Sequence, residues 1–320
     1  MDNNTQAQTT DIHVILGGGQ IGDRLADVLA KQGHAVRVVQ RTRRNESRSN
    51  VTRLAGDVHD AAFRAEAARG ASVVYDCMNP QYHQWQELLL PLGAASLDVA
   101  KLARAKLVAL DCLYMYGIPS GPIREDSPRN PCSKKGELRV RLEALRMAAA
   151  KSGEVQLAIG RASDFFGPGL PNSLFAPRFW QRLEAGKALE CPGDPDMPHS
   201  YNYADDVAQG LATLGSDPRA LGQIWHLPAS SASSTRELFE HIGRAYGKPA
   251  KVRPIPQWLV QTAGLVVPMM REVAEMTYQW QHPYVLDDSR FRSTFGVEAT
   301  PISQAVFSTV AAVRGIQRAA

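Results

Sequence analysis

An apolar run that ends in a glycine cluster constrains the fold of this chain more than any other feature of its sequence. Residues 12–16 read IHVIL, and residues 17–22 read GGGQIG. The chain then places Leu25 and Leu29 on one face of a helical pattern, and a second apolar run follows at 35–40. A strand, a glycine turn, a helix and a second strand in this order predict the first unit of a parallel sheet.

The glycine spacing also predicts a dinucleotide site. Gly17, Gly19 and Gly22 fit the pattern G-x-G-x-x-G. The first glycine permits the tight turn, the second lets the backbone approach a pyrophosphate, and the third lets the helix pack on the strand. Gln20 and Ile21 lie where the helix begins, so its unpaired N–H groups and partial positive charge would face the phosphates. The alternative is an incidental glycine turn.

Strands and helices alternate through the first half of the chain. Strand patterns occur at 35–40, 53–57, 72–77, 106–112 and 155–160, and helical patterns occur at 60–69, 85–103 and 133–151. This alternation predicts an α/β fold of the Rossmann type, which is a doubly wound parallel sheet with helices on both faces.

The pattern changes after Gly167, where prolines become frequent. Further helices are predicted at 174–185 and 205–214, and a last strand at 224–227. Another helix is predicted to begin at a capping box and to end at Tyr246. The capping box is Ser234-Thr235-Arg236-Glu237.

These patterns divide the chain into two expected domains and a tail. An NAD(P)-binding domain is predicted over 11–165 and also receives about 201–228. The remaining residues, 166–320 (mainly 166–200 and 229–320), form a smaller and mainly helical substrate domain. Residues 1–10 are polar and are predicted to be a disordered tail.

Composition narrows the partners and the compartment. A net charge of +4 makes no general case for nucleic acid or a membrane, and the arginines at 41–53 lack interleaved aromatic residues. The four cysteines form no C-x-x-C pair, so no metal site and no disulfide framework is expected. The first residues contain no signal-peptide core, and the longest apolar run, 259–270, is interrupted by Pro268. We expect a cytoplasmic protein with a small-molecule substrate, compatible with a homodimer.

Several short motifs follow one another in a characteristic order. They are GGGQIG at 17–22, Gly56-Asp57, Tyr116-Gly117, Arg161 with Gly167-Pro168, Gly193-Asp194, YNYADDV at 201–207, and Asp288-Ser289-Arg290-Phe291 with Phe295-Gly296 and Pro301. In this order the chain resembles the extended and atypical short-chain dehydrogenases/reductases, often called the NAD-dependent epimerase/dehydratase group, over about 11–315. The resemblance implies hydride transfer between NAD(P) and a small carbonyl, hydroxyl or sugar-nucleotide-like substrate in an interdomain cleft.

The chain departs from this family at the catalytic pair Tyr-x-x-x-Lys. At the start of the helix 133–151, the tyrosine position holds Lys135 and the lysine position holds Arg139. In the family the tyrosine is a general acid/base whose pKa is lowered by the lysine. Lys135 takes this role only if burial beside Arg139 lowers its pKa, and the alternative is that both are solvated. Arg139 stays charged and is no base.

The strand 106–112 offers a second candidate. Strand alternation places Cys112, Tyr114 and Tyr116 on one side, and the resemblance places this strand end beside the nicotinamide. Tyr114 is expected either to donate a proton from a shifted position or to pack in the domain interface. Cys112 stands where the family has a serine or threonine. Nothing nearby makes it a thiolate, so a small buried residue is favoured over a nucleophile.

The end of the second strand bears on the choice of cofactor. Gln40 stands where an acid would hold the ribose 2′-hydroxyl of NAD, and Arg41 and Arg44 follow it. With no carboxylate there to repel a 2′-phosphate, and with guanidinium groups suited to phosphate, NADP is favoured over NAD. The resemblance adds Asp57 at the adenine edge and Asn79 near the riboses.

The substrate region is less informative. The resemblance implies an arginine clamp for a diphosphate just before residue 201, but His199 and Ser200 stand there, and Arg178 with Arg182 is the nearest substitute. Asp205 and Asp206 are expected to cap a helix rather than bind a metal. Six residues of the second domain form an apolar set that is expected to be core: Trp258, Met269, Met270, Met276, Tyr278 and Trp280. A non-catalytic NAD(P)-binding sensor or regulatory protein is the alternative to an enzyme.

Overall fold

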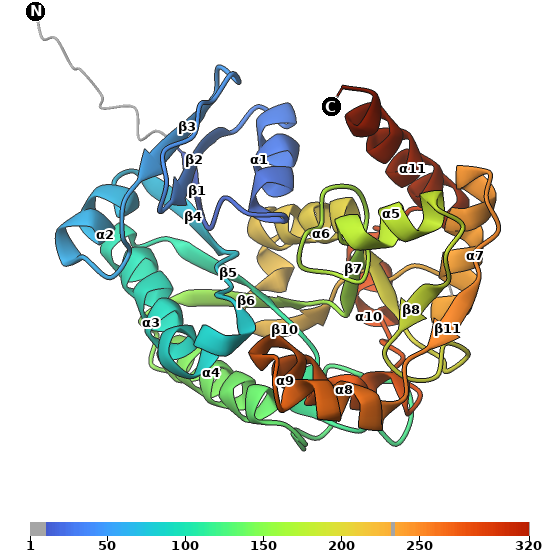
Figure 1. Ribbon diagram of the computed structural model, residues 1–320. Helices are drawn as coiled ribbons and strands as arrows, with labels where there is room; N and C mark the ends of the chain where they lie inside the picture. Colours follow the sequence, from blue (N-terminus) through green and yellow to red (C-terminus); the bar gives the residue numbers. More distant parts are fainter. Residues whose placement is uncertain (1–10, 232–233, 320) are drawn as a thin grey trace, which may run out of the picture.

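A parallel seven-stranded sheet lies at the centre of the larger part of the molecule (Figure 1). The computed structural model describes residues 11–231 and 234–319, so the tail predicted at 1–10 lies outside the described residues. The strands are β1 (Ile12–Leu16), β2 (Ala35–Gln40), β3 (Val51–Ala55), β4 (Ala71–Asp76), β5 (Lys106–Asp111), β6 (Gln156–Arg161) and β10 (Gln223–His226). Their order is β10-β6-β5-β4-β1-β2-β3. The winding therefore reverses between β1 and β4, which is the switch point where such sheets bind ligands.

Helices cover both faces of the sheet because the strands are apolar on both sides. Val14 and Ile15 are successive residues of β1 and are buried in two different cores. On the Ile15 side lie α1 (Gly22–Lys31) and α6 (Ala204–Ser216); on the Val14 side lie α2 (Ala61–Ala68), α3 (Trp85–Ala103) and α4 (Lys134–Lys151). The predicted Rossmann-type α/β fold is confirmed.

The second part of the molecule has its own aromatic core. It contains two small sheets, β7 (Asp164–Phe166) with β9 (Tyr201–Tyr203) and β8 (Leu189–Cys191) with β11 (Val252–Pro254). Its helices are α5 (Pro177–Glu184), α7 (Thr235–Tyr246), α8 (Gln257–Gly264), α9 (Pro268–Ala274) and α11 (Ile302–Ala319), whereas α10 (Ser289–Phe295) packs Phe291 into the core of the large sheet. Helix α11 runs alongside α7 (Figure 1), and both bury apolar residues with the aromatic side chains of α5.

Local sequence signals locate most helix starts. Ser234 accepts the backbone N–H of Glu237 at 3.2 Å, as predicted for the start of α7, and Ser133 caps α4 in the same way by accepting the Gly136 N–H at 3.0 Å. Helix α5 begins later than predicted, because Pro177 occupies its first turn. Of the predicted apolar set, Met276, Tyr278 and Trp280 are buried and Trp258 is 64% exposed.

The prediction that Asp205 and Asp206 cap α6 is wrong. The residue at the N-cap position is Tyr203, and no side chain caps the helix. Asp206 instead accepts hydrogen bonds from the backbone and hydroxyl of Thr300, at 2.8 and 2.6 Å, and Asp205 pairs with Arg24 at 2.7 Å. Both acids point to segments distant in sequence, so local patterns do not show their partners.

No helix in the described part of the chain is both long and apolar enough to cross a bilayer.

Candidate functional site

The glycine loop between β1 and α1 is shaped by the absence of side chains. Gly17 has φ +104°, and a Cβ there would lie 2.9 Å from the carbonyl group of Cys77. A Cβ on Gly22 would lie 1.9 Å from the Gly17 carbonyl oxygen, so the helix approaches the strand only through glycine. Gly19 differs, because a Cβ there would meet nothing within 4 Å. Gly19 therefore faces open space at the switch point, where the pattern places a pyrophosphate.

The start of α1 fits the same interpretation. Ile21 is the N-cap residue of α1, and no side chain forms a capping hydrogen bond at this end of the helix. The side-chain oxygen of Gln20 is buried and has no hydrogen-bond partner among the described residues. An open helix N-terminus next to a glycine turn is suited to a phosphate group.

Acidic side chains accompany the arginines at the end of β2, which corrects the expectation that no carboxylate lies there. Arg44 contacts Asp23 at 2.9 Å, and Arg53 contacts both Asp23 and Glu46 at 2.9 Å. Gln40 accepts a hydrogen bond from Arg53 at 3.0 Å. Asp23 belongs to α1 and Glu46 to the loop after β2, so the acids are brought in by folding.

Arg41 and Arg43 are the arginines after β2 that form no ion pair with any described residue. Both are exposed, whereas Arg44 also donates to the Gly18 carbonyl at 2.9 Å. The carboxylate of Asp57 accepts the His59 backbone N–H at 2.9 Å in an exposed turn.

Arg139 links the ends of two neighbouring strands. Its guanidinium donates to Asp111 at 3.0 Å and to the side-chain oxygen of Asn79 at 2.8 Å, and it lies 4.3 Å from the centre of the Trp85 ring. Burial lowers the pKa of Arg139, but neighbouring Cys112 and Asp111 raise it to a net value above the usual one. Arg139 therefore stays charged and positions Asn79.

Lys135 is buried, so the expectation that it is solvated is wrong. Only 3% of its side chain is exposed, and its Nζ lies 2.5 Å from Glu272 and 2.6 Å from Glu275. Its backbone N–H donates to Glu275 as well, at 3.0 Å. Both acids belong to the α9 segment, more than a hundred residues away in sequence, which no local pattern connects to Lys135.

Tyr114 does not lie on a strand, because β5 ends at Asp111. Residues Tyr114–Tyr116 form a 3₁₀ turn, so the alternation that placed Cys112, Tyr114 and Tyr116 on one side does not apply. The Tyr114 hydroxyl lies 2.6 Å from the Tyr82 hydroxyl. Burial raises the pKa of Tyr114 far above its usual value, so this hydroxyl keeps its proton.

Cys112 is not activated as a nucleophile. Burial raises the pKa of its thiol to about 11, although Arg139 acts in the opposite direction. A thiol with this pKa stays protonated near neutral pH, which favours the small buried residue over the nucleophile.

Sequence patterns did not indicate a second polar pair, formed by Asp164 and His199. Nε2 of His199 lies 2.8 Å from Oδ2 of Asp164. Asp164 starts β7 and His199 precedes β9, and these two strands pair in parallel. The only sequence signal was His199 in place of the expected clamp arginine. The substitutes, Arg178 and Arg182, each contact Glu190 at 3.2 Å and so are not free for a diphosphate.

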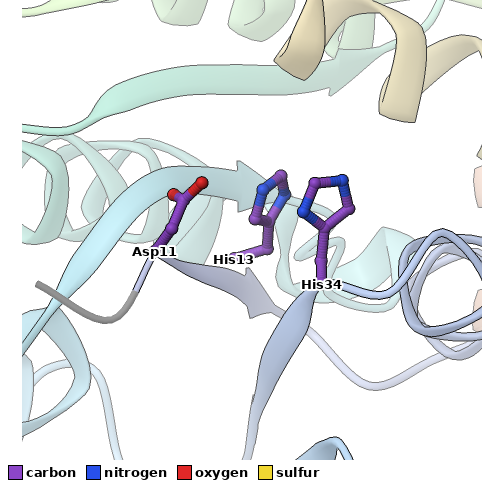
Figure 2. A group of neighbouring side chains, drawn as sticks. All are labelled: Asp11, His13 and His34. Atoms are coloured by element: carbon purple, nitrogen blue, oxygen red, sulfur yellow. The ribbon is translucent and has the colours of Figure 1, made fainter. Parts of the chain in front are cut away.

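A further group of side chains lies at the amino ends of β1 and β2, whereas the glycine loop follows the carboxyl end of β1. Figure 2 shows the imidazoles of His13 and His34 side by side, with the Asp11 carboxylate next to His13. One potential ligand atom from each lies within 4.8 Å of the others, and His13 also contacts the Tyr75 hydroxyl at 3.0 Å. The spacing of the cysteines does not point to this group, because its members are one acid and two histidines. It takes no part in the site at the switch point.

Fold and glycine loop together define a Rossmann-type protein with a site suited to a dinucleotide at its switch point. The chain belongs to the NAD-dependent epimerase/dehydratase family, because the model of that family matches residues 13–227. The resemblance stated from the motifs is thereby confirmed.

Curated relatives are distant, and the first two match only in part. An uncharacterised protein of Sinorhizobium fredii is 28% identical over 41% of this chain and 37% of its own length. The 2′-dehydrokanamycin reductase of Streptomyces kanamyceticus is 26% identical over 44% of this chain and 41% of its own. The chain thus spans less than half the length of these two relatives.

Solved structures share the fold over nearly the whole chain. The dTDP-glucose 4,6-dehydratase of Bacillus anthracis, solved with NAD, superposes with a TM-score of 0.77 at 15% identity, covering 96% of this chain and 98% of that one. The UDP-glucuronic acid 4-epimerase of Bacillus cereus, also solved with NAD, gives 0.77 at 16% identity, with 95% and 99% covered.

Proposed function

We propose that this protein is an NAD(P)-dependent oxidoreductase or epimerase that transfers hydride to or from a small carbonyl or hydroxyl compound or a sugar-nucleotide-like substrate. The observation that carries the proposal is the open glycine loop, in which Gly19 leaves room for a backbone-bound pyrophosphate. Family membership supports it. A bound nicotinamide would supply the acceptor or donor of hydride.

In this proposal, residues of the chain itself bind the dinucleotide and orient it. The glycine loop and the open end of α1 hold the pyrophosphate. Arg139 keeps Asn79 in place near the riboses by donating to its side-chain oxygen, which leaves the Asn79 amide to face a ligand. Tyr114, after β5, and Tyr82, in the turn before α3, hold protonated hydroxyls 2.6 Å apart, and Lys135 is held by two glutamates rather than free to move a proton.

For the cofactor we favour NADP, with NAD as the alternative. The exposed, unpaired side chain of Arg41 supports binding of a 2′-phosphate, while Asp23 and Glu46 offset part of the positive charge nearby. Replacing Arg41 and Arg44 by alanine is expected to weaken NADPH binding about tenfold, as befits the loss of a charged phosphate contact, and to leave NADH binding within about twofold. Equal losses for both cofactors would contradict an NADP preference.

Cofactor binding tests the proposal directly. Fluorescence titration of the full chain with NADPH and NADH is expected to show saturable binding that Gly19→Ala weakens at least about tenfold, because the added methyl occupies the space for the pyrophosphate. Gly121→Ala is the matched control, since a Cβ there also meets nothing within 4 Å and the residue lies outside the loop. The absence of binding by the wild-type chain, or an unchanged affinity of Gly19→Ala, would refute the proposal.

Turnover separates an enzyme from a sensor. The missing Tyr-x-x-x-Lys pair is the observation that favours a non-catalytic dinucleotide-binding protein. Oxidation of UDP-glucose or UDP-glucuronic acid, or reduction of carbonyl compounds, is followed by the absorbance of the reduced nicotinamide. Saturable cofactor binding without turnover across such a panel would favour the sensor.

A further inference from the structure

A buried imidazole and a partly exposed carboxylate meet where β7 and β9 lie side by side. Nε2 of His199 is 2.8 Å from Oδ2 of Asp164. The imidazole is fully buried, and its ring stacks on Trp280 at a centroid distance of 4.9 Å with 10° between the planes. The Asp164 side chain is 26% exposed. Asp164 is therefore the member of the pair that a small molecule can reach.

The partners of the two ring nitrogens determine how many protons the pair holds. Nδ1 of His199 lies 3.0 Å from the backbone oxygen of Gln279. A carbonyl oxygen only accepts, so Nδ1 carries a proton. Nε2 faces a carboxylate oxygen at 2.8 Å, and one proton must lie between them for a hydrogen bond. The pair thus holds a shared proton, written either as imidazolium and carboxylate or as imidazole and carboxylic acid.

The other carboxylate oxygen is available to a ligand. Oδ1 of Asp164 has no hydrogen-bond partner among the residues that the structure describes, since the His199 contact is made by Oδ2. His199 is held by the Trp280 ring and by the Gln279 carbonyl, so it fixes the orientation of the carboxylate.

Asp164 also lies near the residues that end β5. Burial raises the pKa of Tyr114 most, Tyr82 raises it next, and the charge of Asp164 raises it further. The charge of Asp164 also raises the pKa of Tyr82. These two hydroxyls keep their protons, and so does the Cys112 thiol. Lys135 is bound by two glutamates. Among these groups, the carboxylate of Asp164 is the one that offers a partly exposed oxygen without a hydrogen-bond partner among the described residues.

We propose that Asp164 is the acid/base residue of the reaction, in the place of the missing tyrosine, and that His199 is the positioning residue that shares its proton. The inference rests on the proposed hydride transfer. When a substrate alcohol is oxidised, Oδ1 of Asp164 takes its O–H proton as the C=O bond forms, and a bound oxidised nicotinamide would supply the acceptor of the C–H hydride. In the reverse direction the proton returns to the oxygen as hydride reaches the carbon. The shared proton lets His199 carry the resulting positive charge.

The proton count is tested by NMR without any substrate. The full chain labelled with ¹⁵N-histidine is compared with His199→Gln, which assigns the His199 signals among the eight histidines. Nδ1 of His199 is expected to be protonated, and a strongly downfield proton between Nε2 and the carboxylate is expected to disappear in Asp164→Asn. The absence of that downfield proton in the wild-type chain would overturn the proposal.

Kinetics test the role of the proton. With a substrate that the wild-type chain converts, Asp164→Asn is expected to lower kcat by about a hundredfold or more, as for removal of a general acid/base, with KM and NADPH affinity nearly unchanged. Asp98→Asn makes the same change at an exposed acid of α3, outside this pair, and serves as the control, with kcat within about threefold. Asp164→Glu, which restores a carboxylate, is expected to recover part of the loss.

The possible failures are distinguishable. A kcat for Asp164→Asn within about threefold of wild type would overturn the acid/base role while leaving the proposed hydride transfer intact. A wild-type chain that binds no cofactor would refute the proposed function, and with it the acid/base role, while the NMR spectrum would still decide whether the pair shares a proton.

Discussion

Acidification is expected to destabilise the fold through His226, at the end of β10. The residue is fully buried. Its Nδ1 faces the backbone oxygen of Asp287 at 3.1 Å, and its Nε2 accepts from the Tyr116 hydroxyl at 3.0 Å, which itself accepts from Arg161 at 2.6 Å. Burial, followed by the nearby positive charge of Arg161, lowers the pKa of His226 to about 3. The native state therefore holds this imidazole neutral across the accessible acidic range.

The sign and size of the effect follow from the pKa difference. In the unfolded chain a histidine titrates near pH 6.5, so between about pH 6.5 and 3 the unfolded state binds a proton that the native state does not. Stability therefore falls as pH falls through this window, by about 1.4 kcal/mol per pH unit. At pH 5, roughly 1.5 units below the unfolded pKa, His226 alone lowers the free energy of unfolding by about 2 kcal/mol relative to pH 7.5.

Urea denaturation at pH 7.5 and pH 5 measures this difference. His226→Gln keeps a polar side chain but does not titrate. It is expected to be less stable at pH 7.5, because it loses buried hydrogen bonds, yet to lose about 2 kcal/mol less than wild type on acidification. Exposed His59→Gln is the control and should follow the wild type. Equal losses of stability in wild type and His226→Gln would refute the assignment. Burial and His34 lower the pKa of His13 to about 4. His13 therefore adds the same acid-dependent loss of stability to the wild type and to both variants.

Three further outcomes test contacts around the site. The double change Glu272→Gln and Glu275→Gln leaves the ammonium of Lys135 buried without a counter-charge and is expected to cost about 3 kcal/mol in urea denaturation, with unchanged stability contradicting the double ion pair. Gly22→Ala puts a Cβ 1.9 Å from a carbonyl oxygen of the glycine loop and should lower the free energy of unfolding by about 2 kcal/mol and abolish NADPH binding. Thr300→Val removes a hydroxyl bond to a carboxylate of α6 and should cost about 1 kcal/mol in thermal denaturation.

Local periodicity was sufficient for the elements of the larger sheet. The strand and helix patterns predicted β1, α1 and β2 because alternation along a strand and the helical repeat are properties of short segments. The same local argument was wrong at Tyr114, where the chain leaves the strand at Asp111 and turns. A period of two holds only while the backbone stays extended, and nothing in the residues 112–116 marked the change.

The glycine loop, the parallel sheet and the absence of a Tyr-x-x-x-Lys pair were determined by the sequence alone, because each depends on residue type at fixed spacing. Only the tertiary structure decided which charges meet. Lys135 finds its two glutamates on a segment 137 and 140 residues away, and Asp164 finds His199 across 35 residues. Ion pairs act over a few ångströms, so they depend on how α9, β7 and β9 pack rather than on any pattern along the chain.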